Sequence, residues 1–150
     1  MNTPARSRAR SAARLAAVQA LYQWHMEKTA LAKLLDEFHQ HRLGAKIEDD
    51  QYEDAEVDFF DDVVSGVIAR QAEIDETLTG KLAQGWTLLR LDKTMLQILR
   101  CGAYELMARS DIPVGTAISE YVDVAHAFFD EREAKFVNGV LDAVAKDVRD

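Results

Sequence analysis

Arginines near the start of the chain have the spacing of one helical face. Arg6, Arg10 and Arg14 are four residues apart, and Arg8 lies between the first two. Residues four apart are neighbours on one side of an α-helix, so these side chains would form a ridge of guanidinium groups. Such a ridge is typical of a surface that binds the phosphate backbone of RNA or DNA. The alternative is a solvated terminus, or one that pairs with the chain's own acids.

The distribution of charge favours the first interpretation. The chain has 150 residues and a formal net charge of −8, which as an average argues against a nucleic-acid partner. Residues 1–14, however, hold four arginines and no acid, which gives +4, while the other 14 basic residues against 26 acids give −12. Nine carboxylates without a base lie from Glu48 to Asp62. A basic edge on an acidic body would bind phosphate at one place and repel it elsewhere.

A second candidate binding site lies near the start of the last expected helix. Phe136 falls at the edge of that helix's apolar face, and Lys135 and Asn138 fall outside it. An exposed ring can stack on an unpaired base, beside a cation and an amide that bind phosphate and base edges. Periodicity alone leaves it equally open that Phe136 packs in the core. Trp24 lies opposite the large apolar residues of its helix, so we expect it at a second packing layer or at a partner surface.

The residues that catalysis or metal binding would need are scattered. His39 and His41 are two positions apart and fall on different helix faces, with no third ligand at a metal-binding spacing. Cys101, the single cysteine, lies in an apolar helical pattern without a neighbouring His or Lys, so we interpret it as a small core residue. The seven glycines form no phosphate-binding loop. The sequence predicts a binding protein with no catalytic residue, metal or cofactor.

Helices must position these candidate residues. Apolar residues recur with helical spacing and nowhere alternate over the length of a strand, and glycine and proline together number only nine. The pattern predicts helices at residues 9–27, 30–43, 57–80 (as one helix or two), 92–109, 115–129 and 134–149, with a turn and loop at 81–86. We therefore expect an all-α bundle of six or seven helices.

The first of these helices is expected to pack through its large apolar side chains. These form one narrow stripe, made of Leu15, Val18, Tyr22 and Met26. The arginines would then lie opposite or beside the stripe, facing solvent, and residues 1–9 would form a flexible arm. With one cysteine, no signal peptide and no apolar run of membrane length, the chain is expected in the cytoplasm and away from membranes.

Four short stretches carry a resemblance to a known family. They are residues 17–24 (AVQALYQW), 103–113 (AYEL followed by DIP), 117–120 (AISE) and 135–142 (KFVNGVLD). In this order and spacing they resemble the bacterial NusB transcription antitermination factor family over nearly the whole chain. The resemblance implies one domain over residues 1–150 with an all-α fold of two small helical bundles.

The resemblance also implies a non-enzymatic function. Members bind the single-stranded boxA element of leader RNA together with NusE, a small-subunit ribosomal protein. The assembled complex acts with other Nus factors on RNA polymerase, so that ribosomal RNA operons are transcribed completely. The alternatives are a helical protein that self-associates as a homodimer, or the detached N-terminal domain of an RNA cytosine methyltransferase.

The family's functional residues can be carried over position by position. The N-terminal arginine motif maps onto Arg10 and Arg14, with Arg6 and Arg8 extending it. The Lys-Phe-Val-Asn-Gly motif places Lys135, Phe136 and Asn138 in the set that resembles the RNA contacts. On the NusE-facing side, the resemblance implies Tyr22, with Trp24 as a further partner residue. Met95 occupies a position where many members have a Glu that contacts NusE.

Overall fold

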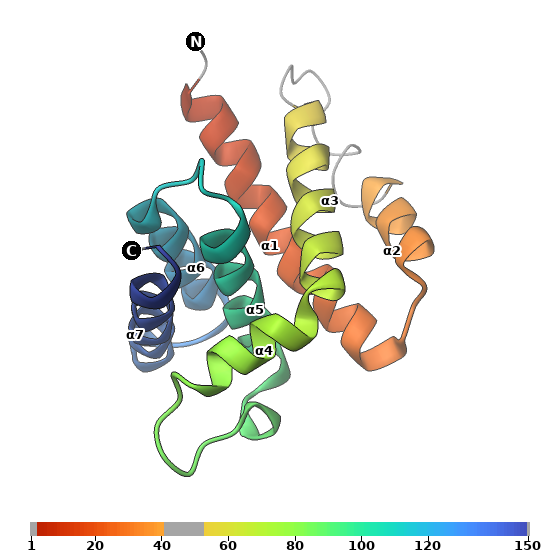
Figure 1. Cartoon of the computed structure of the whole chain (residues 1–150). Helices are drawn as coiled ribbons and strands as arrows, with labels where there is room; N and C mark the ends of the chain where they lie inside the picture. The colour runs from red at the N-terminus through yellow and green to blue at the C-terminus, as the bar shows by residue number, and fades with distance from the viewer. Residues whose placement is uncertain (1–2, 41–52, 150) are drawn as a thin grey trace. The chain divides into compact units, whose positions relative to one another are not determined.

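The computed structural model describes residues 3–40 and 53–149, and the side chains of residues 7–40 and 57–149. Within these residues the chain forms seven α-helices and one short 3₁₀-helix, and none of them is in a strand (Figure 1). The elements are α1 (Thr3–Glu27), α2 (Leu31–Phe38), α3 (Glu53–Ala69), α4 (Gln71–Thr79), η3 (Leu88–Arg90), α5 (Lys93–Ala108), α6 (Val114–Phe128) and α7 (Glu131–Val148). The predicted all-α class is confirmed.

Several helix boundaries differ from the predicted ones. The segment 57–80 is two helices, because the backbone leaves helical geometry at Arg70, with φ −110° and ψ 20°. Helix α1 begins at Thr3, six residues before the predicted start at residue 9. Helix α2 has α-helical geometry up to Phe38, and residues 39–40 continue it as a π-helical turn. The predicted end near Gly44 and much of the acidic segment from Glu48 lie outside the described residues.

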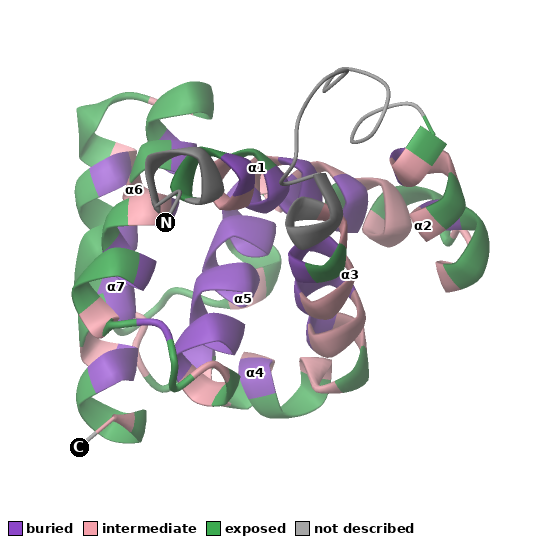
Figure 2. Ribbon diagram, turned by 90° about the horizontal axis from the view of Figure 1, so that it is seen from above, coloured by how far each residue is buried: buried purple, intermediate pink, exposed green. Residues whose placement is uncertain are grey.

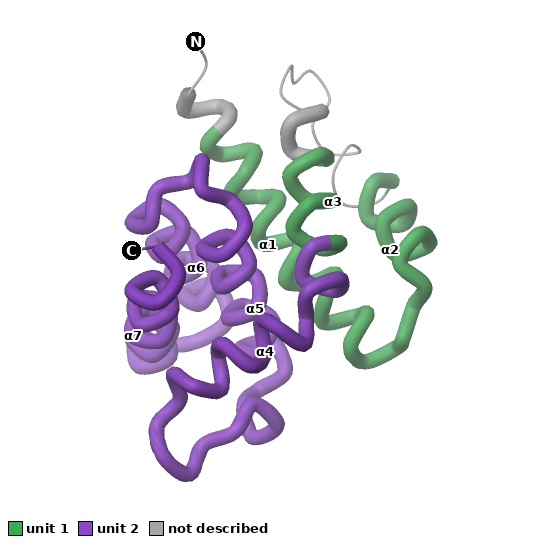
Figure 3. Tube along the Cα trace, in the orientation of Figure 1, with its two compact units in different colours: residues 1–65 green, residues 66–150 purple. Residues whose placement is uncertain are grey.

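Two compact units divide the chain, residues 1–65 and residues 66–150 (Figure 3). The first contains α1, α2 and most of α3, and the second contains α4 to α7. This division agrees with the two small helical bundles that the sequence resemblance implied.

Helix α5 is the centre of the second unit. It packs against α4, α6 and α7, and Figure 2 shows it buried along most of its length. An unbroken run of buried residues extends from Met95 to Leu106. The helix begins where the side chain of Asp92 accepts hydrogen bonds from the backbone N–H groups of Thr94 and Met95, at 2.8 and 3.2 Å. Such an N-cap supplies acceptors for N–H groups that have no partner inside the helix.

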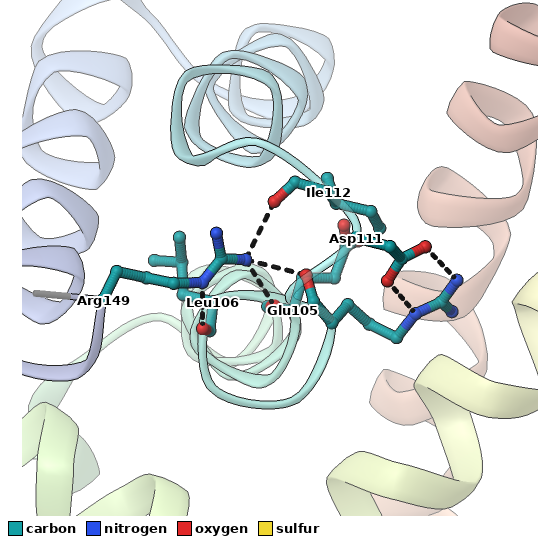
Figure 4. A network of polar contacts seen from close by, with 6 residues as sticks. Glu105, Leu106, Asp111, Ile112 and Arg149 are labelled. Carbon is teal, nitrogen blue, oxygen red and sulfur yellow. Dashed lines mark hydrogen bonds and ion pairs between the residues drawn. The ribbon is translucent and has the colours of Figure 1, made fainter.

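The end of α5 is held by an arginine from the end of the chain (Figure 4). Arg149 donates from Nε to the carbonyl of Leu106 at 2.8 Å, and from Nη2 to the carbonyls of Arg109 and Ile112 at 2.7 and 2.8 Å. The last carbonyls of a helix lack intrahelical partners and carry partial negative charge, so a guanidinium group suits them. Arg149 therefore fastens α7 to the turn that follows α5.

Replacing Arg149 with methionine should lower the free energy of unfolding by about 1.5 kcal/mol, the lower range for hydrogen bonds from a charged donor. Urea titration of the purified protein measures this change. Arg132→Met is the matched control, because Arg132 is an exposed arginine of α7, the helix that Arg149 follows. Equal losses in the two variants would show that Arg149 contributes only its charge.

The first helix packs through small side chains instead of large ones. Its buried face consists mainly of alanines, namely Ala9, Ala13, Ala16, Ala17 and Ala20, with Val18 and Leu21. Of the predicted stripe only Val18 is buried, while Tyr22 and Met26 are exposed. The prediction was wrong because it ranked residues by size. A helix that is approached closely by its neighbours buries its small residues, since large ones would keep the helices apart.

Candidate nucleic-acid interface

The arginines of α1 differ strongly in exposure. Arg8 is exposed, Arg10 is half-buried and Arg14 is only 3% exposed. The guanidinium carbons of Arg10 and Arg14 each lie 4.8 Å from the ring centroid of Phe59 on α3. The predicted exposed ridge is therefore wrong at Arg14, because this residue lies near the alanine face of α1 and is packed against α3. Arg6 lies in α1, and its side chain is outside the described ones.

The Lys-Phe-Val-Asn segment is on the surface of α7, as expected for a binding site. Phe136 is 37% exposed, and Lys135 and Asn138 are exposed beside it. Val137 and Leu141 point the opposite way and are completely buried. The apolar face of α7 thus fixes the helix, and a cation, an aromatic ring and an amide face solvent within one turn. Between the two alternatives for Phe136, the exposed one is confirmed.

Sequence reasoning missed a hollow next to this segment. An open pocket of about 400 Å³ lies at the α6–α7 corner, lined by His126, Ala127, Phe128, Phe129, Asp130 and Glu133. Glu133 is one helical turn before Phe136 on α7, so the pocket adjoins the Lys-Phe-Val-Asn segment. Phe128 is exposed, and its ring centroid lies 6.4 Å from that of Phe129. The adjacent phenylalanines at the end of a helical pattern were the only signal in the sequence.

The expected partner residues have three different environments. Tyr22 is 40% exposed, so its ring, which the apolar stripe placed in the core, is on the surface. Trp24 is half-buried. Met95 is 4% exposed and belongs to the central helix of the second unit. The expectation of a partner contact through Met95 is therefore corrected, since a side chain in the core presents no surface.

The histidine and cysteine side chains have structural surroundings. Nε2 of His39, at the end of α2, lies 2.6 Å from Oδ1 of Asp61 on α3, and its ring meets the edge of Phe60. His41 lies outside the described residues. Cys101 is completely buried, and this burial, together with the nearby Glu105, raises the pKa of its thiol well above the usual value. Its interpretation as a core residue is confirmed, because reactivity requires an accessible thiolate.

Among the described residues, no three or more His, Cys, Asp or Glu side chains are grouped so as to hold a metal ion. Within the same ranges, every helix is too short or too polar to cross a membrane.

The fold defines a small all-α protein of two helical units. The model of the NusB family matches residues 11–146. The chain belongs to the NusB family, and the resemblance seen in the four short stretches is confirmed.

Relatives match the chain over nearly its whole length. The transcription antitermination protein NusB of Novosphingobium aromaticivorans is 75% identical over 142 residues, which is 95% of this chain and 96% of the relative. The protein of the same name from Caulobacter vibrioides is 48% identical, covering 94% of this chain and 95% of the relative.

Solved structures share the fold. NusB from T. maritima superposes with a TM-score of 0.77 at 30% identity, covering 91% of this chain and 90% of that one. A chain in the crystal structure of the antitermination factors NusB and NusE in complex with dsRNA gives a TM-score of 0.79 at 26% identity, covering 93% of this chain and 98% of that one.

Proposed function

We propose that this protein is a transcription antitermination factor that binds boxA-type leader RNA together with NusE and supports complete transcription of ribosomal RNA operons. The observation that carries the proposal is the exposed Lys135, Phe136 and Asn138 on one turn of α7, in a chain that belongs to the NusB family. The structural similarity to a protein crystallised with NusE and RNA supports both partners.

The two candidate surfaces would make different contributions to RNA binding. Arg6, Arg8 and Arg10 on α1 supply attraction to phosphates, which carries no sequence information and weakens with salt. Phe136 stacks on an unpaired base, while Lys135 and Asn138 contact phosphate and base edges. Because the rest of the chain is strongly acidic, non-specific RNA is repelled, and specific binding depends on the correct sequence and on NusE.

We further propose that residues 1–150 act as one domain in the cytoplasm, without a cofactor and without catalysis. Tyr22 and Trp24 face NusE, and other Nus factors and RNA polymerase are engaged through the assembled complex. In the absence of RNA the protein could form a homodimer, and light scattering with and without RNA would show whether such a dimer dissociates on binding.

Binding of two RNAs tests the proposed function. With purified NusE present at about 0.15 M salt, a boxA-type oligomer should bind at least about tenfold more tightly than a scrambled oligomer of equal composition. Fluorescence anisotropy with labelled RNA gives both dissociation constants, with and without NusE. Equal affinity for the two oligomers in the presence of NusE would contradict the proposal, because phosphate attraction alone does not distinguish sequences.

A further inference from the structure

The ring of Phe59 on α3 contacts two arginines of α1 within the first unit. Arg10 and Arg14 are one helical turn apart, and each guanidinium carbon lies 4.8 Å from the ring centroid. This distance is within the range of a cation–π interaction, in which the negative face of the ring attracts the cation. Phe59 and Arg14 are both buried, which strengthens the attraction because water does not screen it.

Contact with a ring does not use up the binding capacity of an arginine. A guanidinium group stacks through its flat face, whereas its five N–H donors point outward in the plane. Arg14 is too deeply buried to meet a ligand in this structure, but Arg10 is half-buried. A ring that holds Arg10 also lowers the number of rotamers available to its long side chain.

We propose that Phe59 is a positioning residue for the RNA-binding arginines. Its ring holds Arg14 inside the unit as a support and keeps Arg10 in a conformation ready to bind phosphate. A side chain that is already ordered loses less conformational entropy on binding, and affinity rises accordingly. Arg14 then affects RNA binding through the position of Arg10 and does not contact the RNA itself. This inference rests on the proposed function, because it concerns the same RNA surface.

If Phe59 had only a structural role, its loss would affect RNA binding no more than the loss of another core ring of α3. Phe60 provides that control. Phe60 is completely buried on the same helix, and its ring stacks on Phe38 with centroids 5.5 Å apart. Phe60→Leu removes an aromatic core contact of α3 and leaves the ring at position 59 in place. Phe59→Tyr keeps the ring, whereas Phe59→Leu and Phe59→Met remove it.

The experiment measures RNA affinity and unfolding temperature for these variants of the full chain. A labelled boxA-type oligomer is titrated in the presence of NusE at several salt concentrations between about 0.05 and 0.3 M. We expect Phe59→Leu and Phe59→Met to bind about five- to tenfold more weakly. The slope of log affinity against log salt should fall by about 0.7, the value of one phosphate contact on a single strand. Phe59→Tyr should keep the affinity and slope of the unchanged protein.

The control separates positioning from stability. Phe60→Leu should lower the unfolding temperature and leave affinity and salt slope unchanged. The inference is overturned if Phe59→Leu and Phe59→Met retain normal affinity and slope, or if Phe60→Leu reduces them as much. If the protein without substitutions does not prefer the boxA-type oligomer, the proposed function itself is contradicted. If the protein prefers boxA-type RNA but the Phe59 variants bind it normally, only the positioning role is contradicted.

Discussion

Replacing Asp75 with alanine should lower the free energy of unfolding by about 3 kcal/mol, because it leaves a buried guanidinium group without its counter-ion. Asp75 on α4 accepts two hydrogen bonds from Arg100 on α5, from Nε at 2.9 Å and from Nη2 at 2.8 Å. The side chain of Arg100 is only 6% exposed, so water would replace the lost carboxylate poorly. Denaturant titration gives the change in the free energy of unfolding.

Two comparisons show whether burial is the cause. The double variant Asp75→Ala with Arg100→Met should recover much of the loss, since removal of both charges leaves none buried alone. Arg70 and Glu73 form a pair of similar geometry, with two hydrogen bonds of 3.0 Å, on the surface. Glu73→Ala should therefore leave stability nearly unchanged. If Glu73→Ala is as damaging as Asp75→Ala, the effect does not come from desolvation.

Replacing Phe136 with alanine should remove most of the preference for boxA-type RNA. Stacking of a base on an aromatic ring contributes about 1–3 kcal/mol, and its loss should weaken specific binding roughly 30-fold. Binding to a scrambled oligomer should change little, because phosphate contacts remain. Because the ring is 37% exposed, the unfolding temperature should fall much less than for a fully buried phenylalanine. Anisotropy titrations with both oligomers, in the presence of NusE, measure the two affinities.

Val148→Ala is a matched control for Phe136→Ala. Val148 lies on the same helix and is also 37% exposed, but it is twelve residues further along, about 18 Å away. Its replacement should not affect RNA binding. Lys135→Gln should weaken binding to both oligomers alike and reduce the salt slope by about 0.7. A Phe136→Ala protein that still prefers boxA-type RNA would show that the base is recognised elsewhere.

Much of the fold and one candidate surface could be predicted from the sequence. The helical period of α7 places Val137 and Leu141 in the core, and this alone turns Lys135 and Asn138 outward. The same reasoning gave the all-α class and the helical segments of the second unit. Periodicity is reliable where one face of a helix is clearly apolar, because burial of that face dominates the energy.

The first helix was predicted poorly for the opposite reason. Its apolar residues are spread around the helix, and many are alanines, which fit either a core or a surface. Large side chains were assigned to the core, but Tyr22 and Met26 are on the surface and the alanines are inside. The spacing of the arginines correctly predicted a helix, but it did not predict that Arg14 faces the core. A helix with small apolar residues on several sides has no single apolar stripe for a sequence to reveal.

The sequence by itself therefore determined the family, the helical class and the exposed Lys-Phe-Val-Asn turn, since these depend on local period and motif. Only the tertiary structure decided that Arg14 lies against Phe59 and that Met95 is in the core. It also placed the ring of Tyr104 against Gly66, so closely that a Cβ there would force the ring to shift. Each of these depends on which residues meet across helices, and a helical period carries no information about the partner on the other side.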